Sequence, residues 1–132
     1  KGIGKVKAVS GFQTTMFSQI LPEQAAIETN TGFYITNGFE VYFIDIKNAD
    51  AELIFSKDAL AKSLQSSNVI LANQLFSCNI SIGIYQDNLL VKLRHQELLL
   101  PSQWLYYCQG NQEYLLELQE NGDTIYILPN RG

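Results

Sequence analysis

The dipeptide Asn37-Gly38 constrains the fold of this chain more than any other feature, because it lies between two strand-like runs. Asn-Gly favours a type I′ turn, in which both central residues take a positive φ angle. We therefore predict a β-hairpin whose arms are Thr31–Thr36 and Phe39–Ile46. Successive side chains of each arm would point to opposite faces of the sheet.

The segment before the hairpin has the periodicity of an amphipathic helix. Large apolar residues recur along it at steps of three and four, namely Val6, Val9, Phe12, Met16, Phe17 and Ile20. Pro22 either kinks this helix or begins a second short one. We predict a long N-terminal helix over residues 5–28 whose C-terminal half packs on the sheet. Toward the start, Val6, Val9, Phe12 and Met16 form a candidate interface with partner subunits.

The sequence of the remaining residues predicts a short helix and a β-meander. Ser56 suits the N-cap of a helical turn over residues 58–64, and Glu52–Phe55 predicts a short strand before it. Later strands are separated by turn residues and are expected at Asn79–Tyr85, Leu89–His95, Gln103–Cys108, Tyr114–Gln119 and Thr124–Leu128. The sequence thus predicts a single α+β domain over residues 1–132, with antiparallel sheet over residues 31–128.

Composition disfavours several classes of function. The chain has 132 residues, of which 46% are hydrophobic and 17% charged, which is enough for one core. Its formal net charge is −4, so we expect no nucleic-acid partner. The small basic cluster of Lys92, Arg94 and His95 is equally well explained by alternation along a half-buried strand. The chain starts at Lys1, and we expect an upstream segment to precede it.

No residue pattern points to catalysis. His95 is the single histidine, and the sequence signals no partnered nucleophile or acid beside it. One histidine and two distant cysteines match no common zinc spacing, and no calcium loop is present. We therefore expect no catalytic, metal-binding or cofactor-binding residue. Cys78 and Cys108 leave two alternatives open, a disulfide bridge or two independent buried thiols.

Several segments occur in an order that resembles a known family. They are the amphipathic helix, Gln24–Ile27, Gly32–Ile35, Gly38–Phe43, Pro101, Trp104–Tyr107, Gly110 and Tyr114–Leu118. This order is similar to that of the H-type minor pseudopilins of bacterial type II secretion. Cys108-Gln109 stands where that family has serines, and the family's Thr-Pro-Phe segment is absent. The resemblance implies a pilin-like fold with a long N-terminal helix on antiparallel sheet.

The resemblance also implies a structural role and no enzymatic activity. The intact protein would be anchored in the inner membrane by an absent N-terminal helix, and would be processed and methylated. Its globular domain would be periplasmic and would lie near the tip of a pseudopilus. Its partners would be other pseudopilins and secreted protein substrates. A periplasmic setting would favour a bridge between Cys78 and Cys108.

Three further classes fit part of this pattern. An acidic secretion chaperone of the type III kind also combines an N-terminal helix, an antiparallel sheet and a low pI. Such chaperones usually end in a helix and dimerise, whereas this chain is predicted to end in strands. A minor pilin of DNA uptake shares the pilin fold, but Arg131 stands among acidic residues here. An enzyme is the least supported class.

Overall fold

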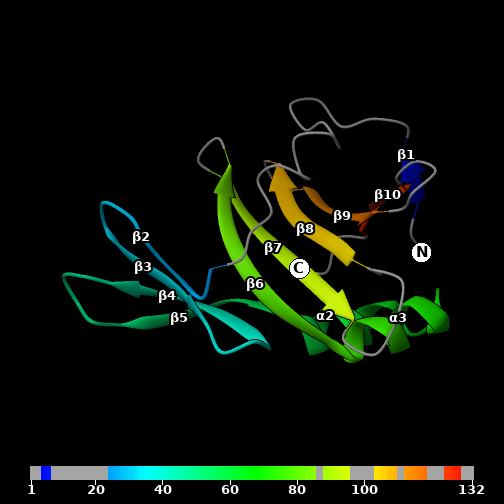
Figure 1. The fold of residues 1–132 in the computed structure, drawn as a ribbon, viewed down its shortest axis with the longest axis horizontal. Helices are drawn as coiled ribbons and strands as arrows, with labels where there is room; N and C mark the ends of the chain where they lie inside the picture. The colour runs from blue at the N-terminus through cyan, green and yellow to red at the C-terminus, as the bar shows by residue number, and fades with distance from the viewer. Residues whose placement is uncertain are drawn as a thin grey trace.

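A computed structural model describes residues 4–6, 24–85, 88–95, 103–109, 112–118 and 124–128. They form a six-stranded sheet of order β1-β10-β9-β8-β7-β6 and a four-stranded sheet of order β2-β3-β4-β5 (Figure 1). Both sheets are antiparallel throughout. The elements are β1 (Gly4–Val6), β2 (Ala26–Glu28), β3 (Gly32–Thr36), β4 (Glu40–Asp45), β5 (Ala51–Ser56), α2 (Lys57–Leu64), α3 (Val69–Phe76), β6 (Cys78–Tyr85), β7 (Asn88–His95), β8 (Gln103–Gln109), β9 (Gln112–Leu118) and β10 (Thr124–Ile127).

The predicted hairpin is present as β3 and β4, but its turn is not of type I′. The backbone N–H of Asn37 donates to the carbonyl of Glu40 at 3.3 Å, so Gly38 and Phe39 are the two central residues. Gly38 has a φ angle of 95°, whereas neither Asn37 nor Phe39 has a positive φ. A glycine with positive φ at the first central position is the arrangement of a type II′ turn. The Asn37 side chain accepts hydrogen bonds from the N–H groups of Phe39 and Glu40.

The prediction of an α+β fold with a long N-terminal helix over residues 5–28 is wrong. Both ends of that range are extended, since Gly4–Val6 pairs with β10 and Ala26–Glu28 pairs with β3. Gln24 exchanges two backbone hydrogen bonds with Ile82 of β6, at 3.1 and 2.9 Å. A neighbouring strand therefore satisfies these backbone groups, where a helix would have used its own turns.

The candidate partner interface cannot form as one helical stripe starting at Val6, because Val6 ends strand β1. Its other members, Val9, Phe12 and Met16, lie outside the described residues. A segment as short as Ala26–Glu28 fits both helical and strand periods, so periodicity alone misassigned it. The described residues are mostly β-sheet with two short helices, and the fold is not pilin-like.

The other local predictions are confirmed, with small shifts at the ends of elements. Strands β6 to β10 form a meander in which each strand pairs with the next along the chain. Ser56 caps α2, since its Oγ accepts a hydrogen bond from the N–H of Ala59 at 3.2 Å. Helix α3 was not predicted; it begins at Val69, and Asn68 caps it by accepting from the N–H of Leu71 at 3.1 Å.

One core cluster joins the helices to one face of the six-stranded sheet. Its buried members are Val41, Phe55, Leu60, Ala61, Leu64, Leu71, Ala72, Leu75, Cys78, Ile80, Ile82, Val91, Leu93, Trp104, Tyr106, Leu115 and Leu128. The four-stranded sheet contributes Val41 and Phe55, which are cross-strand partners, and the partly buried Ile27 and Tyr34 pack against the same cluster. The Phe55 ring lies 4.5 Å from that of Tyr106 in β8. The rest of the four-stranded sheet extends to one side of the body (Figure 1).

Lys57 connects the helices to the four-stranded sheet. Its side chain is buried, and its Nζ donates to the carbonyl of Phe76 at 2.6 Å, at the C-terminal end of α3. The same ammonium contacts the exposed carboxylate of Asp58 at 3.0 Å and lies 5.4 Å from the ring centroid of Phe39. The backbone N–H of Lys57 donates to the carbonyl of Phe39 at 3.1 Å. One residue thus holds α2, α3 and the β3–β4 turn together.

We expect Lys57→Met to lower the free energy of unfolding by about 1.5–3 kcal/mol, because a charge-assisted hydrogen bond is lost and the Phe76 carbonyl is left without it. Urea denaturation followed by circular dichroism measures the change. Asp58→Asn is the matched control, since this exposed ion pair should contribute less than about 1 kcal/mol. Equal losses in the two variants would contradict the role given to the Phe76 contact.

Candidate functional site

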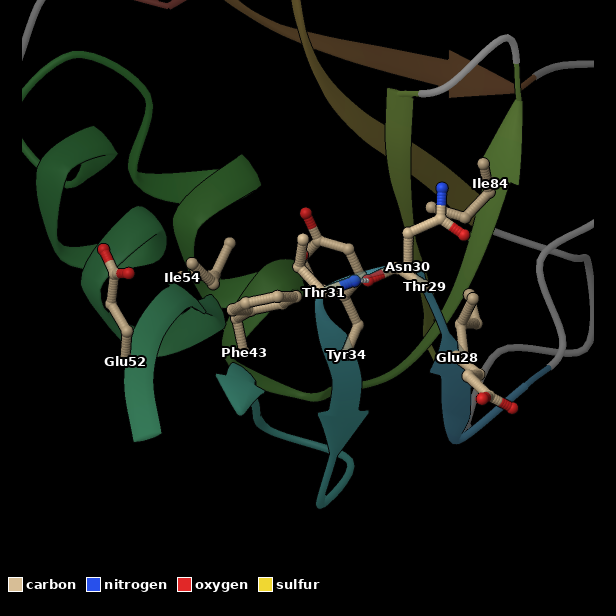
Figure 2. Close-up of a pocket in the computed structure, with 10 residues that line it drawn as sticks. Glu28, Thr29, Asn30, Thr31, Tyr34, Phe43, Glu52, Ile54 and Ile84 are labelled. Atoms are coloured by element: carbon tan, nitrogen blue, oxygen red, sulfur yellow. Dashed lines mark hydrogen bonds between the residues drawn. The ribbon is translucent and has the colours of Figure 1, made fainter. Parts of the chain in front are cut away.

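A groove of about 640 Å³ lies over one face of the four-stranded sheet (Figure 2). We call it the sheet groove, and its lining residues are Ile27, Glu28, Thr29, Asn30, Thr31, Tyr34, Phe43, Glu52, Ile54 and Ile84. Its floor crosses the sheet, and Ile84 of β6 contributes from the edge of the larger sheet. The volume of the groove and its lining of polar and apolar residues are typical of sites that bind small molecules or short peptide segments.

Strand register creates the floor of the sheet groove. Ile27 pairs with Tyr34, Tyr34 with Phe43, and Phe43 with Glu52, so one side chain from each strand lies in a single row. The rings of Tyr34 and Phe43 are 5.0 Å apart and tilted by 58°. Such cross-strand aromatic pairs stabilise a sheet surface and give it a rigid shape. The floor is therefore apolar, with a carboxylate at the β5 end.

A β-bulge adds Ile54 to the groove. Val41 pairs with Phe55 and Tyr42 pairs with Leu53, which leaves Ile54 as an extra residue in β5. An extra residue redirects the side chains beside it and increases the local twist. Figure 2 shows Ile54 on the same side of the sheet as Phe43.

Gly32 is needed where β3 passes under Phe43. A Cβ at this position would collide with the backbone carbonyl of Ile44 and lie 2.8 Å from Cζ of Phe43. The N–H of Gly32 also donates to Oγ1 of Thr29 at 3.1 Å, which fixes the β2–β3 connection at the groove rim. The shape of the groove thus depends on the absence of a side chain here.

We expect Gly32→Ala to destabilise the protein by about 1–3 kcal/mol, as overpacking of a close contact does, and to displace Phe43. Thermal unfolding measures the stability, and the chemical shifts of the Phe43 ring report the displacement. Asn30→Ala, at an exposed position of the same rim, is the control and should change neither. An unchanged Phe43 environment in Gly32→Ala would contradict this packing.

Exposed apolar side chains concentrate on the four-stranded sheet and its turns. Five of the eight large exposed apolar side chains found in the described ranges belong there, namely Phe33, Phe39, Ile46, Leu53 and Ile54. A sixth, Ile84, lines the sheet groove. Clustered apolar exposure of this kind marks interaction surfaces more often than scattered exposure does.

Negative charge concentrates on the same sheet. Residues 24–56 contain five carboxylates and one lysine, a formal charge of −4. They are Glu28, Glu40, Asp45, Asp50, Glu52 and Lys47. The whole chain has thirteen acidic and nine basic residues, so the remainder has eight of each and is formally neutral. The entire formal charge of the protein therefore belongs to the projecting sheet.

Within the described residues, no group of three His, Cys, Asp or Glu side chains is placed to hold a metal ion. Of the three basic residues in β7, Lys92 is buried and Arg94 exposed on one face, while His95 alternates to the other, as expected for alternation along a strand. No helix in this part of the chain has the length and hydropathy to cross a membrane.

Cys78 and Cys108 form no disulfide. Cys78 is level with His95 at one end of β7, whereas the β7–β8 register places Cys108 level with Leu89, six residues away. That separation is about 20 Å along the strand, and a bridge needs Cα atoms within about 7 Å. The bridge alternative is therefore not realised within this chain.

A polar cluster beside Cys108 is structural. The Tyr106 hydroxyl donates a short hydrogen bond to Oε2 of Glu113 and lies 3.5 Å from Sγ of Cys108. Burial of the ring is the main cause of a raised pKa for Tyr106, and its two neighbours raise it further. A buried hydroxyl needs such an acceptor, which is sufficient reason for the Glu113 contact.

We expect the two thiols to react at very different rates with Ellman's reagent at pH 8. Burial raises the pKa of Cys78 to about 12, so almost no thiolate is present at that site, whereas Cys108 is exposed. One thiol per folded chain should react, and two after unfolding in guanidinium chloride. Mass spectrometry should identify Cys108 as the first site, and rapid labelling of Cys78 would contradict its burial.

None of the residues predicted as functional lies in the sheet groove, and of the candidate interface only Val6 is described. The groove residues come from five strands, so no local motif in the sequence indicates them. The signal that does exist is the excess of acidic over basic residues between 24 and 56. Comparison with protein-family models, with curated proteins and with solved structures finds no match for this chain.

Proposed function

We propose that this protein is a binding module whose four-stranded sheet docks a basic and apolar segment of a partner protein. The observation that carries this proposal is the coincidence of clustered apolar exposure and the whole formal negative charge on one projecting sheet. Contact with a partner protein is also the most general part of the role expected from the sequence.

The negative charge of the sheet favours a partner segment with positive charge. Asp50 is exposed just before β5, Glu52 is exposed within it, and Glu28 lies at the opposite side of the sheet groove. A partner segment carrying lysine or arginine would meet complementary charge at both ends, and attraction of this kind raises the association rate. An acidic segment would meet repulsion at the same positions.

The apolar side chains supply the area that a stable contact needs. Tyr34 and Phe43 form the groove floor, Ile54 is exposed beside it, and Leu53 is exposed on the opposite face of β5. Burial of such side chains contributes about 25 cal/mol per Å² of apolar area. Aromatic anchors in a groove with a polar rim are the usual arrangement of a binding hot spot.

The more specific expectations remain predictions. Membership of a secretion pseudopilus, a periplasmic location and a membrane anchor rest on the order of sequence segments alone, because the pilin-like fold was wrong. The chaperone and DNA-uptake alternatives also remain predictions from the sequence. The docking proposal depends on none of them.

The test uses a synthetic basic peptide, acetyl-Ser-Val-Lys-Val-Lys-Ser-amide with a fluorophore, and an acidic counterpart with glutamate in place of lysine. We expect fluorescence anisotropy to show tighter binding of the basic peptide, by about fivefold or more, since two exposed ion pairs are each worth up to about 1 kcal/mol. The preference should decline as salt is added. Equal affinities for the two peptides, or no binding of the basic one, would overturn the proposal.

Two matched variants separate the sheet from other apolar surface. Leu53 in β5 is 52% exposed and Val69 in α3 is 56% exposed, so serine at either position leaves the core intact. We expect Leu53→Ser to weaken binding of the basic peptide and Val69→Ser to leave it unchanged. Similar losses in both variants would point to nonspecific adhesion.

A further inference from the structure

We infer that β5 is a docking edge, to which the basic segment adds as a fifth strand of the four-stranded sheet. This inference rests on the proposed function and concerns the β5 side of the sheet alone, at the Glu52 end of the groove; the groove floor and Glu28 are not part of it. Addition of a strand obtains affinity from main-chain hydrogen bonds and specificity from alternate side chains. β5 is the outer strand of its sheet, on the side away from β2.

The register shows which backbone groups of β5 point outward. The N–H of Asp45 donates to the carbonyl of Asp50 at 3.1 Å, so this pair is hydrogen-bonded. Pairs alternate along an antiparallel ladder, which makes Ile44–Ala51 and Tyr42–Leu53 the non-hydrogen-bonded pairs. The N–H and C=O groups of Ala51 and Leu53 therefore point away from β4.

The hydrogen bonds on the other side of β4, toward β3, confirm this alternation of pairs. The N–H of Ile46 donates to the carbonyl of Thr31 at 3.0 Å, and the carbonyl of Glu40 accepts from Asn37. Even-numbered residues of β4 thus bond toward β3, and odd-numbered ones bond toward β5. Within the described residues, no backbone group pairs with the outer side of Ala51 or Leu53. Both residues are exposed, and their four polar groups are available to an added strand.

Side-chain alternation along β5 specifies the sequence that fits. Asp50 and Glu52 point to the groove face, while Ala51 and Leu53 point to the other face. Residues of an added strand that hydrogen-bond to Ala51 and Leu53 would lie beside these apolar side chains. Residues opposite Asp50 and Glu52 would lie within reach of a carboxylate. The matching segment alternates apolar and basic residues, which is the pattern of the peptide described above.

A second copy of this chain fits the edge poorly. A two-fold antiparallel pairing that uses the outward groups of Ala51 and Leu53 has Glu52 at its centre. Each Glu52 would then oppose the Glu52 of the other copy, and like charges directly opposite each other destabilise a sheet. The formal charge of −4 on each sheet adds repulsion. The bulge at Ile54 further limits the length of a self-paired edge.

The experiment compares two N-methylated forms of the basic peptide, one methylated at both valines and the other at both lysines. Methylation at the valines removes the N–H groups that bond to β5, and we expect affinity to fall about tenfold or more. Methylation at the lysines affects outward N–H groups and should change affinity less than about twofold. The two peptides carry the same number of methyl groups, so each controls for the other.

Protein variants provide the reciprocal test. Leu53→Pro removes one outward N–H and keeps the ladder to β4, since edge strands accept proline on their solvent side. Leu53→Val keeps the N–H and the apolar character. We expect weaker binding in Leu53→Pro, near-normal binding in Leu53→Val, and slower amide exchange at Ala51 and Leu53 when the peptide is bound. The peptide series remains decisive if Leu53→Pro fails to fold.

The possible results distinguish failure of strand addition from failure of the docking proposal. If the affinity of the basic peptide is unchanged by methylation at the valines and by methylation at the lysines, strand addition is overturned. The docking proposal would then remain intact. Absence of binding would overturn both. A stable dimer in sedimentation that is disrupted by Leu53→Pro would show that a second copy, and not a basic segment, occupies the edge.

Discussion

The hydrogen bond from the buried ammonium of Lys57 to the carbonyl of Phe76 is the interaction on which the arrangement of this protein depends. It joins the start of α2 to the end of α3, where helix carbonyls have no partner within the helix. The Lys57 side chain is buried, and its ammonium lies 5.4 Å from the ring centroid of Phe39 in the β3–β4 turn. The four-stranded sheet is thereby fixed to the helices at its base.

The four-stranded sheet contacts the rest of the fold through part of its surface, which includes Ile27 and Tyr34 packed against the core. Val41 and Phe55 enter the common core, Gln24 bonds to Ile82, and the carbonyl of Gly38 accepts from the N–H of Ile80 at 2.9 Å. These contacts lie on the side of the sheet nearest β6 and the helices. Because stability is concentrated there, the distal residues of the sheet are free to keep apolar exposure and unbalanced charge. That separation allows one small domain to hold both a core and a docking surface.

The positions of most strands and the meander of β6 to β10 were predictable from the sequence, whereas the N-terminal strands and the site were not. Alternating runs bounded by turn residues identified β3 to β10 outside the helices, and Ser56 was recognised as a cap because its chemistry is local. The N-terminal helix was misassigned because Ala26–Glu28 forms a strand only by pairing with β3, which is a tertiary event. The groove row from Ile27 to Glu52 depends on the register of four strands and has no local signature. Its acidic surroundings, in contrast, are visible in the sequence.

Glu52 and the bulge at Ile54 have opposite consequences for different partners. Natural sheets protect exposed edges with charges and bulges, and these two features would discourage pairing of β5 with itself. The same carboxylate attracts a strand that places lysine or arginine opposite it, so the device that prevents self-association also selects the partner. Specificity of this kind arises from repulsion of wrong partners as much as from attraction of the right one. An apolar edge without Glu52 would bind more strands with less discrimination, and this explains why charge and apolar exposure occur together on β5.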